Sequence, residues 1–199
     1  MSSPLQTPAI VLLSAGGGRR FGASKQLAEF DGMPLARRCA SAALATGASV
    51  SVVTGADGDA VRASLAGLPL ALVHNPDWAR GIGCSLACGV RALLAGRPPP
   101  PSILLHLADL PAVAAADLDR IIQVWRAAPD RVVVAGFAAG TGPPVLFPPR
   151  LFAALADLDG DRGARDLVLA EGGAAIVVPV AGAAWDIDTP DDLARFASD

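Results

Sequence analysis

The sequence predicts an α/β fold of three layers, in which a Rossmann-like, mostly parallel sheet is covered by helices on both faces. Short apolar runs alternate with amphipathic segments along almost all of the 199 residues, the pattern of repeated β-α-β units. The first apolar run, AIVLLSA at residues 9–15, is unbroken, as expected for a strand buried on both faces. No long linker divides the chain, so we expect a single domain over residues 1–199.

Strands are expected where short apolar runs are bounded by glycine, proline or polar residues. In chain order these are residues 9–15, 49–54, 70–74, 103–108, 131–137 and 174–180. Residues 140–149, rich in glycine and proline, are expected to form a loop with a short apolar centre at 145–147. Ligands of such folds bind at the carboxyl ends of the strands, so we expect the site in the segments that follow them.

Helices are expected where apolar residues recur with a period near 3.6. Residues 118–125 show this pattern most clearly, with Leu, Ile, Ile and Trp at positions i, i+3, i+4 and i+7. Pro34 and Gly47 mark the start and the end of the first helix. The expected helices are residues 34–46, 59–65, 85–95, 118–125, 150–156, 164–169 and 191–196.

The composition limits the classes of function. A net charge of −3 argues against broad binding of nucleic acid. No apolar run reaches the roughly 18 residues of a membrane span, and residues 1–8 lack the basic region of a secretory signal, so a cytoplasmic protein without a membrane partner is expected. The odd number of cysteines argues against a disulfide framework. Cys84 and Cys88, four residues apart, are expected to pack on a helix and not to bind a metal.

The loop after the first expected strand, SAGGGRRFGASK from Ser14 to Lys25, combines glycines with cations. The three consecutive glycines at 16–18 let backbone N–H groups turn toward a ligand, and the cations suit phosphate oxygens. Two standard phosphate motifs fail here, GxGxxG because Phe21 replaces a small residue and GxxxxGK[ST] because Ala23 replaces lysine. We interpret the loop as a site for the polyphosphate of a nucleoside triphosphate; a flexible turn with surface arginines is the alternative.

The same loop resembles the signature L-A-A-G-x-S-x-R-M/F-G-x-x-K of the nucleotidyltransferases that activate small molecules. The residues that match are Leu13, Ala15, Gly16, Arg20, Phe21, Gly22 and Lys25, whereas Ser14 and Gly18 replace the usual Ala and Ser. By this resemblance, the nucleotide-binding residues of the loop are Leu13, Ser14, Ala15, Gly16, Gly17, Gly18, Arg20 and Lys25. Arg20 and Lys25 would act in catalysis by balancing the charge of the polyphosphate.

A second block, NPDWARGIGCSL, resembles the molybdenum cofactor cytidylyltransferases within this group. The resemblance to these enzymes covers about residues 8–197. Asn75, Gly81 and Ser85 are the residues of this block that match. The resemblance implies that the block lines the base pocket. Ser85, near the start of the expected helix, would contact the base, cap the helix, or do both.

Two acidic blocks of the same resemblance imply a metal site. Asp109 of HLADLP directly follows an apolar strand, and the resemblance makes it the catalytic ligand of Mg²⁺ (or Mn²⁺), a metal that prefers carboxylate oxygens. In WDIDTPDDL, Asp188 is the first choice for the second ligand and Asp186 the second choice. The alternative is that Asp188 and Thr189 only cap the last helix. His106, inside its strand, is expected to belong to the core.

The segments GTGPPVLF and LDGDRGAR resemble the acceptor side of the family. They make Gly142, Pro143, Asp161 and Arg165 the candidate acceptor-binding residues, with Pro143 where many relatives carry His or Asn. Arg165 would either reach an acceptor phosphate or pair with Asp161. The domain would then divide into a nucleotide-binding part at about 8–112 and an acceptor-binding part at about 113–199.

The resemblance implies Mg²⁺-dependent transfer of CMP from CTP to the molybdenum–molybdopterin cofactor, with release of pyrophosphate and transient contact with a recipient molybdoenzyme. Ala15, at a position where guanylyltransferases carry glycine, favours CTP over GTP. Two alternatives stay open. One is a guanylyltransferase or another small-metabolite nucleotidyltransferase of the same fold, and the other is a non-enzymatic carrier of nucleotide or cofactor for a molybdoenzyme.

Overall fold

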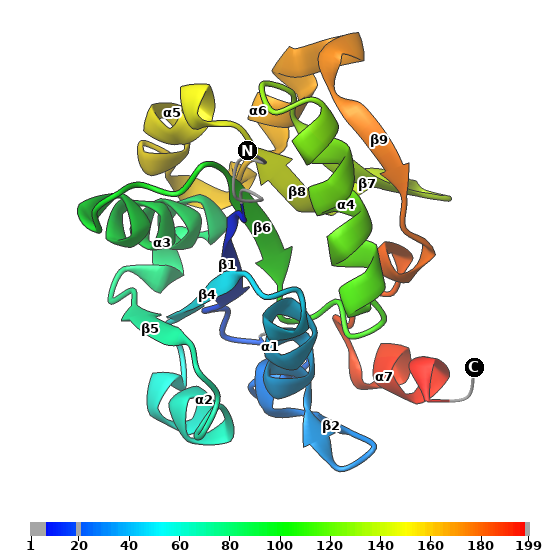
Figure 1. The fold of residues 1–199 in the computed structure, drawn as a ribbon. Coiled ribbons are helices and arrows are strands. Elements are labelled where there is room, and N and C mark those ends of the chain that lie inside the picture. Colours follow the sequence, from blue (N-terminus) through cyan, green and yellow to red (C-terminus); the bar gives the residue numbers. More distant parts are fainter. Residues whose placement is uncertain (1–6, 19–20, 198–199) are drawn as a thin grey trace.

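A seven-stranded sheet forms the centre of the computed structural model, which describes residues 7–18 and 21–197 (Figure 1). Its strands are β1 (Ala9–Ser14), β4 (Ser49–Thr54), β5 (Ala71–His74), β6 (Ile103–Leu107), β7 (Val133–Phe137), β8 (Gly140–Phe147) and β9 (Ile176–Pro179). They lie in the order β5-β4-β1-β6-β8-β7-β9. Only β8 runs antiparallel to its neighbours. The mostly parallel sheet that the sequence predicts is therefore confirmed.

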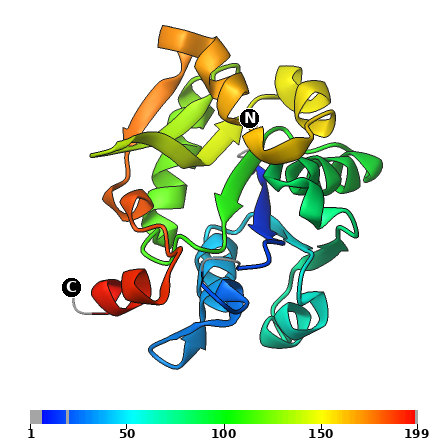
Figure 2. The same ribbon diagram turned by 180° about the vertical axis from the view of Figure 1, so that it is seen from behind.

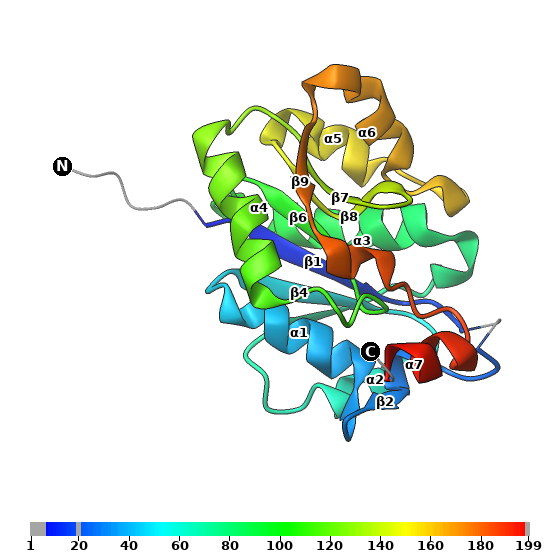
Figure 3. The same cartoon turned by 90° about the vertical axis from the view of Figure 1, so that its right-hand side faces the viewer.

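Helices cover both faces of the sheet (Figures 2 and 3). They are α1 (Leu35–Ala45), α2 (Gly58–Ser64), α3 (Ile82–Ala95), α4 (Ala115–Ala127), α5 (Phe152–Ala156), α6 (Arg165–Glu171) and α7 (Pro190–Phe196). Side chains of a strand alternate between the two faces. From β1, Ile10 and Leu12 therefore pack with α1 and α4, whereas Val11 and Leu13 pack with α3 and α5. All six residues of β1 are buried, which explains its unbroken apolar sequence.

The largest difference from the sequence-based expectation is β8. Residues 140–149 were expected to form a loop, but 140–147 form a strand between β6 and β7. Val145, Leu146 and Phe147 are buried there and pair with β6. Pro143 and Pro144 lie where the pairing with β7 shifts between Val134 and Ala135. Such an irregularity accommodates prolines, which lack the N–H group of a regular ladder.

The remaining differences are local. A two-stranded hairpin of β2 (Glu29–Phe30) and β3 (Met33–Pro34) precedes α1 and was not expected. The helix expected at residues 85–95 begins three residues earlier, at Ile82. Short 3-10 turns complete the connections at Lys25–Leu27, Trp78–Arg80, Pro149–Leu151, Gly160–Arg162, Gly172–Ala174 and Ala181–Ala184. Across the described residues, no helix has the length and apolar character that crossing a membrane requires.

Candidate active site

The carboxyl ends of the parallel strands β1 and β6 border a cavity of about 350 Å³. This is the edge of the sheet at which a ligand site is expected in such folds. The cavity draws its lining from the loop after β1, the start of α3, the end of β6 and the turn before α6. Its lining residues are Leu13, Ala15, Gly16, Gly17, Gly18, Lys25, Gln26, Trp78, Ala79, Gly81, Ile82, Ser85, Leu107, Asp109 and Asp161.

The glycine loop enters the cavity with a backbone that larger residues would disturb. A Cβ atom on Gly17 would lie 3.0 Å from the Trp78 ring. Gly18 has a φ of +57°, and a Cβ atom there would lie 1.9 Å from the carbonyl oxygen of Ala23. This geometry accounts for glycine at position 18, where the resembling signature has serine. Arg20, expected to bind the polyphosphate, lies outside the described residues.

Gln26 holds the glycine loop in place and was missed by sequence analysis. Its side chain is buried, and its Nε2 donates a hydrogen bond of 2.7 Å to the carbonyl oxygen of Gly16. The Ser24 hydroxyl donates to Oε1 of the same amide at 3.1 Å. A single glutamine in a short non-periodic segment gives no signal of burial in the sequence. Its position directly after Lys25 is the one feature that could have drawn attention to it.

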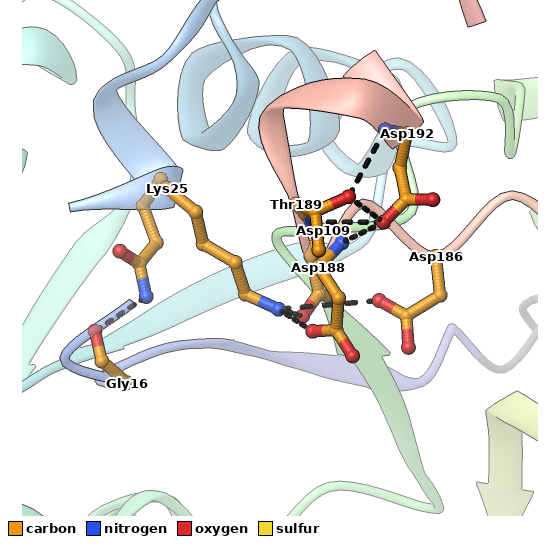
Figure 4. A network of polar contacts seen from close by, with 8 residues as sticks. Gly16, Lys25, Asp109, Asp186, Asp188, Thr189 and Asp192 are labelled. Atoms are coloured by element: carbon orange, nitrogen blue, oxygen red, sulfur yellow. Dashed lines mark hydrogen bonds and ion pairs between the residues drawn. The ribbon is translucent and has the colours of Figure 1, made fainter. Parts of the chain in front are cut away.

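Lys25 lies among three carboxylates that come from two segments far from it in the sequence (Figure 4). Its Nζ atom is 2.7 Å from Oδ2 of Asp109 and 2.7 Å from Oδ1 of Asp188. Asp186 is more distant, with Oδ1 at 4.0 Å. The structure therefore brings together all three acidic candidates and the lysine of the glycine loop.

The segment from Asp186 to Asp188 is irregular and is anchored just after the end of β6. Ile187 is fully buried, and its N–H group donates to the carbonyl oxygen of Asp109 at 3.0 Å. With Ile187 in the core, the side chains of Asp186 and Asp188 both point toward Lys25.

Thr189, and not Asp188, caps helix α7. The Thr189 hydroxyl accepts a hydrogen bond from the N–H group of Asp192 at 3.2 Å. In return, Oδ2 of Asp192 accepts from the N–H groups of Thr189 and Asp188. This capping box leaves the Asp188 carboxylate directed at Lys25. The alternative in which the Asp188 side chain serves only as a helix cap is therefore wrong.

The electrostatics of this cluster favour a further cation. Oxygen atoms of Asp109, Asp186 and Asp188 lie within 4.8 Å of one another, and one ammonium group faces the three carboxylates. Burial, followed by the nearby Asp109 carboxylate, raises the pKa of Asp186 to about 6. Burial alone would lower the pKa of Lys25, but the Asp109 carboxylate and hydrogen bonds to Asp109 and Asp188 raise it.

The donor set fits a divalent metal ion. Oδ1 of Asp109 is buried and has no hydrogen-bond partner among the described residues, so it offers a free lone pair to a cation. Hard divalent cations such as Mg²⁺ and Mn²⁺ take carboxylate oxygens as ligands. The cluster of Asp109, Asp186 and Asp188 can therefore hold such an ion.

Ser85 lines the cavity but does not cap the helix, which corrects one of its two expected roles. Helix α3 has Gly81 as its N-cap, and the N–H group of Ser85 already donates to the Gly81 carbonyl oxygen within the helix. The buried Ser85 hydroxyl accepts a hydrogen bond of 3.1 Å from Nδ2 of Asn75. Cys84 is buried and Cys88 partly buried, both as free thiols, and His106 is fully buried as expected.

The four acceptor candidates do not meet in one place. Asp161 lines the cavity, where it lies against Gly81. Gly142 and Pro143 lie on β8, and they and the exposed Arg165 do not border the cavity. Among the described residues, no ion pair joins Arg165 to Asp161. Trp78 borders the cavity and was not singled out from the sequence, although it lies in the block that was expected to line a base pocket.

The sheet is mostly parallel, and its first strand leads into a glycine loop. The lysine after this loop lies beside a cluster of carboxylates. This is the architecture of a nucleotidyltransferase. The model of one family, described as the MobA-like NTP transferase domain, matches residues 10–176. The chain therefore belongs to the MobA-like NTP transferase family.

The similar proteins and solved structures cover 78% or more of the chain. Nicotine blue oxidoreductase of Paenarthrobacter nicotinovorans is 32% identical over an alignment of 165 residues, with 78% of this chain and 78% of that protein covered. The crystal structure of Rv0371c from Mycobacterium tuberculosis H37Rv is 32% identical, with a TM-score of 0.84 over 98% of this chain and 99% of that chain. The same protein in complex with manganese is 31% identical, with a TM-score of 0.79 over 96% and 99%. A nucleotidyl transferase from Methanothermobacter thermautotroptrophicus is 25% identical, with a TM-score of 0.77 over 96% and 95%.

Proposed function

We propose that this nucleotidyltransferase transfers CMP from CTP to the molybdenum–molybdopterin cofactor and releases pyrophosphate. The observation that carries the proposal is the meeting of the glycine loop, Lys25 and Asp109 at one cavity, with Asp186 and Asp188 beside the same lysine. A polyphosphate with a divalent cation needs this combination of backbone donors, one ammonium group and carboxylate oxygens. Ala15 supports CTP over GTP, by the resemblance to the cytidylyltransferases.

In this proposal the loop binds the nucleotide through its backbone. The backbone of residues 15–18 presents N–H groups to the phosphates, with Gln26 fixing the path of the loop through the Gly16 carbonyl oxygen. Lys25 and Arg20 balance the negative charge of the polyphosphate. Ser85 contacts the base from the start of α3, where it lines the cavity.

Asp109 and Asp188 are the proposed ligands of Mg²⁺ or Mn²⁺, with Asp186 close enough to join them. When bound, the cation would supply positive charge to the phosphate oxygens. The manganese complex of the similar protein Rv0371c supports the proposal of a divalent metal for the present chain. Lys25, in contact with the same carboxylates, would hold them in place and face the phosphates from the loop side.

The proposed step is an attack of an acceptor phosphate oxygen on the α-phosphorus of CTP. A new P–O bond forms, the bond between the α-phosphorus and its bridging oxygen breaks, and pyrophosphate leaves with that oxygen. A phosphate nucleophile is already anionic, so no protein group has to remove a proton. The chain then contributes positioning and charge neutralisation.

We also propose a single domain of two parts, with nucleotide bound by about residues 8–112 and acceptor by about 113–199. Asp161 supports a junction of the two parts at the cavity, because it borders the same space as the glycine loop. Gly142, Pro143 and Arg165 would bind more distant portions of a large acceptor. Release of the product to a recipient molybdoenzyme is part of this proposal.

Pyrophosphate release tests the proposal directly. The purified protein is incubated with CTP, GTP, ATP or UTP and Mg²⁺, with and without molybdopterin cofactor. Release with CTP that depends on the cofactor is the expected result. Lys25→Ala and Asp109→Ala should each lower turnover by orders of magnitude, whereas Asp59→Asn, a change of a fully exposed carboxylate on α2, should leave it unchanged.

The other outcomes identify the alternatives. Release with GTP would indicate a guanylyltransferase, and release with a different phosphorylated acceptor would indicate another small-metabolite nucleotidyltransferase. Nucleotide binding without pyrophosphate release would favour a carrier. The Paenarthrobacter relative adds an oxidoreductase as a candidate, so reduction or oxidation of nicotine blue is measured with the same preparation.

A further inference from the structure

A buried amide–hydroxyl pair borders the cavity on the side of α3. Nδ2 of Asn75 lies 3.1 Å from Oγ of Ser85, and both residues are at most 3% exposed. Asn75 follows β5, and its N–H group donates to the carbonyl oxygen of Thr54 at 2.8 Å, so the residue is fixed at the edge of the sheet. Only Ser85 of this pair also lines the cavity.

The orientation of the Asn75 amide is determined by its surroundings. The N–H group of Asp77 lies 3.0 Å from one end of the amide, and a backbone N–H can only donate. That end must therefore be Oδ1, and the NH₂ end must face Ser85. Sγ of Cys84, at 3.7 Å from Nδ2, takes the second position beside the NH₂ group.

This orientation determines the polarity of the Ser85 hydroxyl. An amide NH₂ group has no lone pair to offer, so the hydroxyl oxygen must accept from Asn75. Its own proton is then directed elsewhere, and among the described residues no acceptor lies within hydrogen-bond distance of it. Because Ser85 lines the cavity, the free O–H donor is available to a ligand there.

We propose that Asn75 is a positioning residue that makes Ser85 a hydrogen-bond donor toward the bound nucleobase. The cavity would then select a base that places a carbonyl oxygen or an unprotonated ring nitrogen at Ser85. Cytosine offers two adjacent acceptors of this kind, O2 and N3; uracil offers the carbonyl oxygens O2 and O4 but carries a proton at N3, so the two bases differ in a donor's favour only at N3. The inference rests on the proposed nucleotide function and adds to it the polarity of the group that contacts the base.

The exchange of Asn75 for aspartate tests this polarity with almost no change of shape. A carboxylate still accepts from the Asp77 N–H group, but its second oxygen accepts the Ser85 proton, so Ser85 turns a lone pair toward the base. Binding of CTP and of inorganic tripolyphosphate, both with Mg²⁺, is measured by calorimetry. Asn75→Asp should lower the affinity for CTP about tenfold, the usual effect of one lost hydrogen bond. The affinity for tripolyphosphate, which has no base, should stay unchanged.

Two further variants show whether Asn75 acts through Ser85. Ser85→Ala should weaken CTP to a similar extent, and adding Asn75→Asp to it should change CTP affinity less than about twofold, because the hydroxyl is already absent. Ser85→Thr keeps the hydroxyl and should restore most of the affinity. If the buried carboxylate prevents folding, Asn75→Ala replaces Asn75→Asp in this experiment. It should lower the affinity for CTP and leave the affinity for tripolyphosphate unchanged.

The inference is overturned if Asn75→Asp binds CTP as the unchanged protein does. It is also overturned if the substitution weakens CTP and tripolyphosphate equally, or if the effects of the two substitutions simply add. Failure of the unchanged protein to bind CTP at all would instead contradict the proposed nucleotide function. The two kinds of failure are therefore separate.

Discussion

The Nζ atom of Lys25 lies 2.7 Å from Oδ2 of Asp109, although the lysine belongs to the loop after β1 and the aspartate follows β6. The two strands are parallel neighbours, so their carboxyl ends bring the two side chains together. The contact has a consequence for ligand binding. The ammonium group contacts one oxygen of Asp109 and one of Asp188, and the same two carboxylates would hold a divalent cation, so its positive charge opposes metal binding. The phosphates of a nucleotide would draw the ammonium group away from these carboxylates.

Replacement of Lys25 by methionine should strengthen the binding of Mn²⁺ without nucleotide about tenfold or more, because hydrogen bonds between charged groups contribute about 1.5–3 kcal/mol. Titration of Mn²⁺ followed by electron paramagnetic resonance measures the change. Lys25→Arg keeps the positive charge and is the control. Equal Mn²⁺ affinity in the methionine variant and the unchanged protein would show that the ammonium group does not compete with the metal.

Asp188 should matter more than Asp186 for the binding of the metal. The Asp188 carboxylate is 2.7 Å from Lys25, whereas that of Asp186 is 4.0 Å away and more exposed. Asp188→Asn should lower the affinity for Mn²⁺ by about tenfold or more, as expected for the loss of one charged ligand. Asp186→Asn should have a smaller effect. The reverse order in the same titration would make Asp186 the principal partner of Asp109.

Gln26 should affect nucleotide binding through the glycine loop. Gln26→Ala removes the hydrogen bond to the Gly16 carbonyl oxygen and should lower the free energy of unfolding by about 1 kcal/mol. The Michaelis constant for CTP should rise. Gln26→Glu cannot donate to a carbonyl oxygen and should be at least as harmful. A glutamate variant with the kinetics of the unchanged protein would contradict this role.

Gly18→Ser restores the residue of the resembling signature and should nevertheless be harmful here. A left-handed conformation costs a non-glycine residue about 1–2 kcal/mol, and the new Cβ would lie 1.9 Å from the Ala23 carbonyl oxygen. We expect weaker binding of CTP and of tripolyphosphate, measured by calorimetry. Gly22→Ser, also at positive φ but without atoms within 4 Å of its Cβ, is the matched control. Unimpaired binding by the Gly18 variant would mean that the loop has another conformation in solution.

His106 should make the protein less stable in mild acid. Burial lowers its pKa from 6.5 to about 4, so between these values the unfolded chain binds a proton that the folded protein does not. The free energy of unfolding should therefore fall as the pH falls from 7 to 4, by up to about 3 kcal/mol from this one residue. Urea unfolding at several pH values measures the dependence. His106→Leu should remove the part of the pH dependence that comes from His106. His74→Gln, at an exposed position, should leave that part in place.

Much of the fold follows from local patterns. The unbroken run of β1, the strand Ser49–Thr54 and the helix at residues 115–127 were all predicted near their observed bounds. Burial of a strand on two faces gives a continuous apolar run, and burial of one helix face gives apolar residues with a period near 3.6. Both patterns can be recognised among residues that are close in sequence. The loop of residues 140–149 was predicted wrongly because glycine and proline usually mark turns. Here an irregular pairing with β7 accommodates the prolines within a strand.

The sequence by itself determined the alternation of strands and helices, the glycine loop and the acidic residues that follow β6 and precede α7. Only the tertiary structure decided which of them meet. Lys25 and Asp188 are 163 positions apart, and no local pattern encodes the 2.7 Å between them. The roles of Gln26 and Asn75 likewise depend on partners fixed by packing. Periodicity records which side of a segment is buried, whereas a site is made where separate segments end at the same edge of a sheet.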